Sequence, residues 1–225
     1  GVIQRAYEKT GERVVILVDE YDKPLLQAIG DDKLQDTFRT TLKSFYGALK
    51  SKDDCIKFAM LTGVTKFGKV SVFSDLNNLK DISLDNRYYN LCGIDEGELH
   101  GVFEPYVQCL ADSQNITLDK AYSELKRNYD GYHFSKNMVG MYNPFSLLNA
   151  FDSLEIGSYW FETGTPTYLV ELLKKNDYAL EEMDNTIVGF ETLSGIDATD
   201  TDAIPVIFQS GYLTIKDFNP RFQSY

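Results

Sequence analysis

The chain has 225 residues, of which 43% are hydrophobic and 25% are charged, so a globular protein of this length can bury a sizeable core. No apolar run reaches the roughly 18 residues that a membrane-spanning helix needs, and residues 1–5 do not resemble a signal peptide. With 34 acidic and 22 basic residues the net charge is −12, which argues against direct binding to DNA or RNA, because such binding depends on neutralising phosphates.

The cysteine and histidine content indicates a reducing compartment and argues against a zinc centre. The chain has Cys55, Cys92 and Cys109, an odd number without CxxC spacing. Cys55 and Cys109 stand in apolar or mixed contexts, so we expect both to be buried free thiols. With only two histidines, a zinc site would have to combine distant residues. We therefore expect a cytoplasmic protein.

The N-terminal segment predicts a helix, a buried strand and an acidic pair. Residues 2–12 suit a helix that stops at Gly11. Val14–Val18 is a valine-rich run of apolar residues, which predicts a strand buried on both faces inside a parallel sheet. Asp19 and Glu20 follow directly, at the end of the strand where ligands of open α/β folds bind.

The acidic pair has two interpretations. Two carboxylates at the carboxyl end of a strand can hold Mg²⁺ through water and orient an attacking water, as the Walker B motif does in phosphate-loop ATPases. Alternatively, Asp19 and Glu20 open a solvated turn before Pro24 starts a helix. The motif alone leaves both interpretations open, because an apolar run followed by acids is common.

A helix over residues 34–50 and a second strand over residues 56–63 are predicted next. Asp31 and Asp32 suit the N-terminus of that helix. The strand–helix–strand order implies that the two strands are parallel neighbours. Apolar residues spaced mostly by four predict one stripe that packs on the sheet, formed by Leu34, Phe38, Leu42, Phe45 and Leu49.

Residues 63–71 nearly match the phosphate-loop pattern GxxxxGK[ST]. Gly63, Gly68 and Lys69 are in place, but Val70 occupies the hydroxyl position. A phosphate loop also precedes the acidic strand in its domain, whereas this segment follows it. We reject it as the phosphate loop and interpret it as a polar loop, either a plain connection or a sensor of a γ-phosphate.

Beyond residue 71 the sequence predicts one short strand, at 86–92, and then a change to mainly helical structure. We place a domain boundary near residues 93–97, which gives domains 1–95 and 96–225. The second domain is predicted to contain helices at 98–110, 118–128 and 144–151, a hairpin at 129–142, an aromatic segment with a helix at 160–173, a helix at 204–209 and a strand at 211–215, with Thr117 and Asn143 as helix caps.

Several blocks of the sequence resemble one protein family, the large bacterial AAA-ATPase-like proteins. They occur in the family's order over nearly the whole chain, so the resemblance is specific. The blocks are ILVDEYDKPL at 16–25, LTGVTKFGKVSVFSDLNNLKDISL at 61–84, YDGYHFS at 129–135, YNPFSLLNAF at 142–151, YWFETGTPTYLVELL at 159–173 and FQSGYLTIKDF at 208–218.

The resemblance implies an α/β fold. It implies a partial P-loop NTPase-like parallel sheet with helices, followed by a helical and winged-helix-like region. Full-length relatives carry a phosphate loop before this part and a nuclease-like domain of the PD-(D/E)XK class after it. We expect the chain to be an internal piece of such a protein, with ATP and Mg²⁺ as the parent's ligands and the nuclease-like domain as an intramolecular partner.

The resemblance also assigns roles by position. Asp19 matches the Mg²⁺-associated acid, and Glu20 matches the residue that polarises the attacking water. Thr62, Thr65 and Lys66 lie where a γ-phosphate sensor is expected. Asp22 is part of the family's sequence motif, but the resemblance gives it no defined role. Arg87 is a conceivable arginine finger, although an ordinary salt bridge is the simpler interpretation.

The predicted function is therefore the middle part of an ATPase that couples nucleotide binding or hydrolysis to a conformational change. The isolated chain, without the phosphate loop, is expected to hydrolyse ATP negligibly. The alternative is a non-catalytic regulatory or protein-interaction module with a vestigial nucleotide site, which the abundance of Tyr and Phe would suit. A metal nuclease built on Asp19 and Glu20 is disfavoured by the acidity of the chain.

Overall fold

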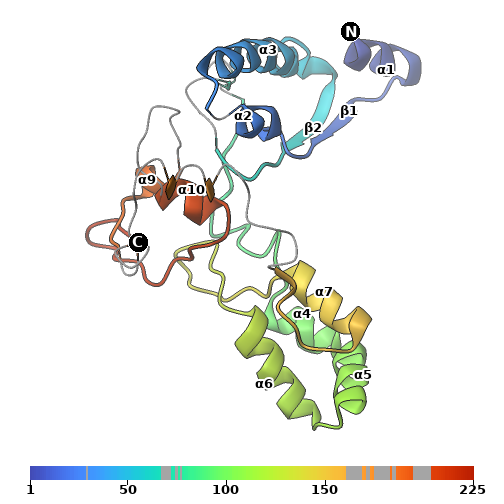
Figure 1. The fold of residues 1–225 in the computed structure, drawn as a ribbon. Helices are drawn as coiled ribbons and strands as arrows, with labels where there is room; N and C mark the ends of the chain where they lie inside the picture. The colour runs from blue at the N-terminus through green and yellow to red at the C-terminus, as the bar shows by residue number, and fades with distance from the viewer. Residues whose placement is uncertain are drawn as a thin grey trace. The chain divides into compact units, whose positions relative to one another are not determined.

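The fold is a mixed α/β arrangement divided into two compact units (Figure 1). Unit 1 comprises residues 1–80, 167–183 and 190–212, and unit 2 comprises residues 81–166, 184–189 and 213–225. The computed structural model describes residues 1–28, 30–66, 72–73, 76, 78–160, 169–170, 173–174, 183, 186–194 and 204–225. The division into domains 1–95 and 96–225 remains a prediction.

Unit 1 begins with helix α1 (Val2–Thr10). The helix ends at Gly11, which adopts a left-handed conformation with φ 73° and donates its N–H to the carbonyl of Tyr7 at 2.7 Å. Glycine is the residue that most readily takes this conformation. The predicted stop at Gly11 is confirmed, and strand β1 (Val14–Val18) follows.

The two predicted strands are parallel neighbours. Strand β1 pairs with β2 (Ile56–Leu61), with Val14 opposite Ile56 and Val18 opposite Leu61. The connection contains helices α2 (Lys23–Gln27) and α3 (Asp32–Ser51) and a short 3₁₀ helix, η1 (Asp53–Cys55). The predicted α/β class with a parallel sheet is confirmed as a two-stranded sheet in the described part of the chain.

The prediction that β1 is buried on both faces is wrong. Leu17 is 72% exposed and Val15 is 53% exposed, and Phe58, opposite Val15 on β2, is also exposed. Successive side chains of a strand point to opposite faces, so these residues share one open face of the strand pair. An apolar run in the sequence shows that both faces of a strand carry apolar side chains. It does not show that other elements of the fold cover both faces.

Helix α3 is confirmed, but its predicted buried stripe is only partly right. The side chain of Asp31 accepts the N–H of Leu34 at 3.0 Å and caps the helix as expected. Tyr46 and Leu49 are buried, whereas Phe45 is 66% exposed and Leu34 is also exposed. The buried side chains of α3 are Gln35, Tyr46 and Leu49. Since successive helix residues are about 100° apart, these three share a face that is rotated by part of a turn from the predicted stripe. Leu34 and Phe45, at the far edge of that stripe, are therefore exposed.

The core of unit 2 is formed by helices. Helices α5 (Glu104–Gln114), α6 (Leu118–Tyr129) and α7 (Pro144–Ser153) contact one another (Figure 1). Helix α4 (Glu96–Gly101) precedes them. Their fully buried side chains include Leu99, Val107, Leu110, Leu125 and Leu147.

The single helix predicted at 98–110 is wrong, because the chain forms α4 and α5 instead. Pro105 lies in the first turn of α5, where its missing N–H does no harm but where it would interrupt a continuous helix. A capping box between Asp95 and Glu98 starts α4.

Two helix caps are confirmed, and the predicted hairpin is present only in part. The Thr117 hydroxyl accepts the N–H of Lys120 at 3.2 Å at the start of α6. The side chain of Asn143 accepts the N–H of Ser146 at 2.8 Å at the start of α7. The hairpin at 129–142 is reduced to one antiparallel bridge between Tyr132 and Met141.

The strand predicted at 86–92 is wrong, because this segment consists of turns. The carboxylate of Asp85 accepts bonds from the backbone N–H and the guanidinium of Arg87, with a shortest distance of 2.6 Å. These local bonds stabilise a turn instead of a strand. They also make Arg87 part of an exposed salt bridge, as the simpler interpretation held. Cys109, expected to be buried, is exposed, whereas Cys55 is buried as expected.

Helices α9 (Phe190–Ser194) and α10 (Ile204–Gln209) return to unit 1. The helix at 204–209 is confirmed, but residues 211–215 form a turn and an irregular segment rather than the predicted strand. Most of the predicted segment 160–173, and residues 67–71 of the loop after β2, lie outside the described residues. Among the residues that the structure describes, no helix is long and apolar enough to cross a membrane.

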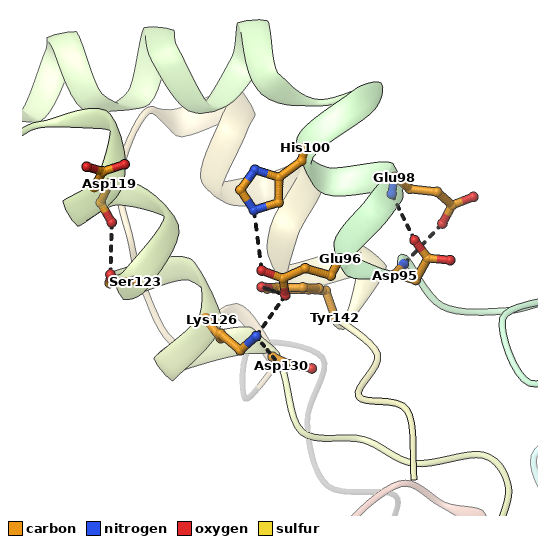
Figure 2. Close-up of polar contacts among 9 residues, drawn as sticks. All are labelled: Asp95, Glu96, Glu98, His100, Asp119, Ser123, Lys126, Asp130 and Tyr142. Carbon is orange, nitrogen blue, oxygen red and sulfur yellow. Dashed lines mark hydrogen bonds and ion pairs between the residues drawn. The ribbon is translucent and has the colours of Figure 1, made fainter. Parts of the chain in front are cut away.

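An ionic cluster joins elements of unit 2 (Figure 2). The Glu96 carboxylate accepts the Tyr142 hydroxyl at 2.8 Å and the Lys126 ammonium at 2.9 Å, and it lies 3.3 Å from Nε2 of His100. Burial alone would raise the pKa of Glu96, but the hydrogen bonds and charge of its partners outweigh burial and lower that pKa. The cluster ties the start of α4 to α6 and to Tyr142, two residues before α7.

Candidate functional site

The polar residues that follow β1 and β2 meet at one end of the strand pair. The N–H of Thr62 donates to the carbonyl of Val18 at 2.8 Å, and the N–H of Tyr21 donates to the carbonyl of Thr62 at 2.9 Å. These bonds continue the pairing past the last strand residues. Asp19 and Glu20 therefore lie beside residues 62–66, which we call loop 62–66.

Asp19 and Thr62 are in direct contact. One oxygen of the Asp19 carboxylate, Oδ1, accepts the Thr62 hydroxyl at 2.5 Å and the backbone N–H of Glu20 at 2.9 Å. The Asp19 side chain is exposed at this edge. Both donors bind Oδ1, and together they orient the carboxylate. The structure thus brings together two of the predicted site residues from two strands.

Glu20 forms a local ion pair. Its backbone adopts a left-handed conformation with φ 52°, which is uncommon for a residue other than glycine. Its carboxylate lies 2.6 Å from the Lys23 ammonium, and both side chains are more than half exposed. The hydrogen bond to Glu20 and its negative charge raise the pKa of Lys23. The Glu20 side chain is therefore directed along the turn that starts α2.

Asp22 is the buried acid of this segment. Its side chain is fully buried, and it accepts three hydrogen bonds from loop 62–66. The donors are the backbone N–H of Val64 at 3.2 Å, the backbone N–H of Thr65 at 2.6 Å and the Thr65 hydroxyl at 2.7 Å. A buried carboxylate without such partners would be strongly unfavourable. Asp22 therefore holds the loop, and the hydroxyl of Thr65 is used in doing so.

Gly63 allows Asp22 to approach the loop. A Cβ atom at position 63 would lie 2.5 Å from Oδ1 of Asp22 and 2.8 Å from the ring of Tyr21. Real side chains do not tolerate such distances, so the loop requires glycine at this position. Gly63, the first glycine of the near-match to the phosphate-loop pattern, therefore has a packing role.

Aromatic side chains pack beside this contact. The hydroxyl of Tyr21 donates to the carbonyl of Thr65 at 2.9 Å, and its ring lies 5.0 Å from that of Phe73. Tyr46 of α3 contacts Phe73 from 5.4 Å. Burial and the negative charge of Asp22 raise the pKa of the Tyr46 hydroxyl. Loop 62–66 is thus supported by α3 as well as by the strands.

Lys66 connects the loop to the C-terminal helices of unit 1. Its backbone N–H donates to the side-chain oxygen of Gln209 at 2.7 Å. The side-chain amide of Gln209 in turn donates to the carbonyl of Leu193 at 2.8 Å. Gln209 is the last residue of α10 and Leu193 lies in α9, so one side chain bridges three segments.

The donor set fits Mg²⁺ better than a softer metal. In the described part of the chain, no group of three or more His, Cys, Asp or Glu side chains could enclose a metal ion. Mg²⁺ does not need such an enclosure, because it is commonly held by one or two carboxylates together with water and phosphate oxygens. Asp19, exposed and fixed through one oxygen, suits this mode of binding.

Sequence reasoning missed three residues of this arrangement. The sequence gives Asp22 no defined role and gives Gly63 only a place in the rejected phosphate-loop pattern. It predicts only that Gln209 lies in a helix. Asp22 and Gly63 offered a signal, since an acid just after one strand and a glycine just after its parallel neighbour are brought to the same edge. Gln209 is 143 residues from Lys66, and no local pattern indicates that contact.

Comparison with known proteins gives one family and one relative. Residues 1–73 match the family model described as "Predicted AAA-ATPase". The chain is also 42% identical over 214 residues to an "Uncharacterized protein in vnfD 5'region" of Azotobacter chroococcum mcd 1. That alignment covers 95% of this chain and 39% of the relative, so the chain spans well under half of its length. No solved structure matches the chain. The family match confirms the predicted resemblance over residues 1–73.

Proposed function

We propose that the edge formed by Asp19, Glu20 and loop 62–66 is part of an ATP·Mg²⁺ site, and that the full-length protein hydrolyses ATP there. The observation that carries the proposal is the 2.5 Å contact between Asp19 and Thr62 at the carboxyl ends of two parallel strands. Ligands of open α/β sheets bind at this end. The family match over residues 1–73 supports the same assignment.

Asp19 and Glu20 would have different roles in ATP hydrolysis. Asp19 would hold Mg²⁺ directly or through its water shell, where the ion neutralises charge on the phosphates. Glu20 would accept a hydrogen bond from the attacking water and orient it in line with the γ-phosphate. For this, the ion pair of Glu20 with Lys23 must open or turn, and both side chains are more than half exposed, so water screens their attraction.

The hydrogen bonds of Thr62 and Thr65 bear on which residue of loop 62–66 would sense a γ-phosphate. The Thr65 hydroxyl is bound to buried Asp22, and the Thr62 hydroxyl is bound to Asp19. Lys66 has the positive charge that a sensor of phosphate needs. We propose Lys66 as the sensor on the ground of its charge, Thr62 as the residue that orients Asp19, and Thr65 as a structural residue.

The test is ATP turnover by the full-length protein. Asp19→Asn keeps the size and the oxygen that binds Thr62 but removes the charge. We expect turnover to fall about a hundredfold or more, because the metal-associated charge is worth several kcal/mol in such sites. Asp53→Asn is the matched control, since Asp53 precedes β2 at the opposite end of the strand. Equal activity of the Asp19 variant and the wild type would refute the proposal.

A second measurement separates the ATPase from the alternative of an interaction module. A fluorescent ATP analogue is titrated into the full-length protein and into the 225-residue chain, each with and without Mg²⁺. We expect Mg²⁺-dependent binding by the full-length protein and only weak binding by the 225-residue chain, because residues 63–71 do not match the phosphate-loop pattern. Absence of binding by the full-length protein would favour the interaction module.

A further inference from the structure

The side chain of Gln209 lies at a junction between the candidate site and two helices far along the chain. Its oxygen accepts the N–H of Lys66, and its nitrogen donates to the carbonyl of Leu193. Both distances, 2.7 and 2.8 Å, are those of well-formed hydrogen bonds. Gln209 itself is half-buried at the end of α10.

The two contacts require a carboxamide. A backbone N–H can only donate and a carbonyl can only accept, so the bridging group must offer one acceptor and one donor in a fixed geometry. Among long side chains only glutamine does so, because glutamate accepts but does not donate when ionised, and lysine donates but does not accept. The carbonyl of Leu193 lies in the last turn of α9, where helix carbonyls have no partner within the helix.

The helices that Gln209 joins are held by apolar packing. Helices α9 and α10 contact each other, and the buried side chains of α10 include Val206, Ile207 and Phe208. Packed elements of this kind shift as units instead of deforming continuously. A displacement of Lys66 would therefore be passed to α10 through one bond and to α9 through the other.

We infer that Gln209 couples the occupancy of the nucleotide site to the position of α9 and α10. The inference rests on the proposed function, because Lys66 must respond to a bound nucleotide. It adds a regulatory output to that function, because the residue proposed to sense phosphate, Lys66, is also bonded through its backbone to Gln209 and so to the helix pair. By linkage, a change in the helix pair must also change the affinity for the nucleotide.

The experiment is hydrogen–deuterium exchange of the full-length protein with Mg²⁺ and a non-hydrolysable ATP analogue. In the wild type we expect the nucleotide to slow exchange in residues 190–194 and 204–212 by about fivefold or more, the lower end of typical allosteric coupling. Gln209→Leu removes both hydrogen bonds, and we expect it to abolish this response while nucleotide binding persists. Gln209→Glu retains only the acceptor, and we expect it to keep the response at 204–212 and to lose it at 190–194.

The control is Gln114→Leu, which removes another bond between distant segments. The amide of Gln114 donates to the carbonyl of Leu154 at 2.7 Å within unit 2. This variant should respond to nucleotide as the wild type does. Exchange in α3 reports whether unit 1 is folded in each variant, and if Gln209→Leu unfolds, Gln209→Glu carries the test.

The outcomes separate the two proposals. If the wild type binds nucleotide but residues 190–194 and 204–212 do not respond, or if both Gln209 variants respond as the wild type does, the coupling is refuted and the ATP site stands. If the wild type binds no nucleotide, the proposed function is refuted, and the coupling falls with it.

Discussion

Three acids stand within four positions of the chain, and their surroundings give them different uses. Asp19 and Glu20 are exposed, whereas Asp22 is fully buried with three hydrogen bonds from loop 62–66. An exposed carboxylate can exchange its partners for a ligand, but a buried one with every donor in place cannot. Asp22 is therefore a structural residue in a segment whose other acids are available for chemistry.

The first prediction concerns the stability that Asp22 provides. Asp22→Ala leaves buried donors of loop 62–66 unpaired, and each such group costs about 1–3 kcal/mol. We expect the free energy of unfolding to fall by about 3 kcal/mol, measured by urea denaturation. The matched control is Asp36→Ala, which removes an exposed carboxylate paired with Arg39 and should cost less than about 1 kcal/mol.

Gly63 gives an independent check of the same contact. Gly63→Ala displaces the Asp22 carboxylate, because the added Cβ would lie 2.5 Å from its oxygen. Once Asp22 has been replaced by alanine, the added methyl group has less to displace. The two substitutions should therefore cost less together than the sum of their separate costs. Strict additivity would mean that the two residues are not in contact.

At the candidate site, the sequence predicts which residues meet but not how each is bound. A strand followed by acids and a parallel strand followed by a polar loop place Asp19 and Thr62 at one edge, and the structure agrees. The hydrogen bonds of Thr65 depend on the burial of Asp22, which no local pattern reveals. The bond from Lys66 to Gln209 depends on a tertiary contact across the chain.

At the scale of elements, helix ends are the features that the sequence predicts best. Gly11, Thr117 and Asn143 end or start helices as expected, because each acts through bonds to its own neighbours. Burial is predicted less well, because it depends on which elements cover a face. The open face of β1 and the shifted stripe of α3 are both errors of this kind.

The second prediction compares two leucines in these elements. Leu17 of β1 is 72% exposed, whereas Leu49 of α3 is 6% exposed. In the 225-residue chain, Leu49→Ala should lower the free energy of unfolding by about 2–5 kcal/mol, as buried leucines do. Leu17→Ala should cost within about 0.5 kcal/mol, because surface substitutions seldom cost more. Equal losses in urea denaturation would show that the outer face of β1 is covered in solution.

The third prediction is a pH dependence from the cluster that ties α4 to α6 (Figure 2). The pKa of Glu96 in the folded state lies below its ordinary value of 4.5. The unfolded state therefore takes up a proton first, so the contribution to stability is present above pH 4.5 and is lost as the pH falls through the folded-state pKa. Because Glu96 and Lys126 are about half exposed, the loss should not exceed about 1 kcal/mol.

The measurement is the stability of the wild type and of Glu96→Gln between pH 6 and pH 3. The variant should be less stable than the wild type at pH 6, and the difference should shrink as the pH falls below about 4.5, the ordinary value for a glutamate. Glu155→Gln, at an exposed position of the same unit, serves as the control. A constant difference between the wild type and Glu96→Gln would show that the cluster contributes no charge-dependent stability.

At the scale of the whole molecule, the charge of the chain determines which large partners it can approach. The net charge is −12, and basic side chains of α6 are paired with acids. Lys120 lies 2.7 Å from Glu124, and Lys126 lies 2.9 Å from Glu96. Arg127 also pairs with Glu124. The basic residues of this helix therefore do not form a surface that could neutralise phosphates.

The last prediction follows from this charge distribution. The 225-residue chain should not bind a labelled DNA duplex in fluorescence anisotropy at 50 mM salt, even near 10⁻⁴ M, roughly the weak end of non-specific DNA binding. Low salt favours electrostatic binding, so any DNA binding by the chain would be easiest to detect under this condition. Glu96→Lys combined with Glu124→Lys raises the net charge by four and removes the acids that pair with the basic residues of α6. This double variant shows whether the assay detects a basic helix on this scaffold. Saturable binding by the wild type that weakens as salt is raised would mean that charges outside these pairs contact phosphate, and that net charge is a poor guide to the partners of this protein.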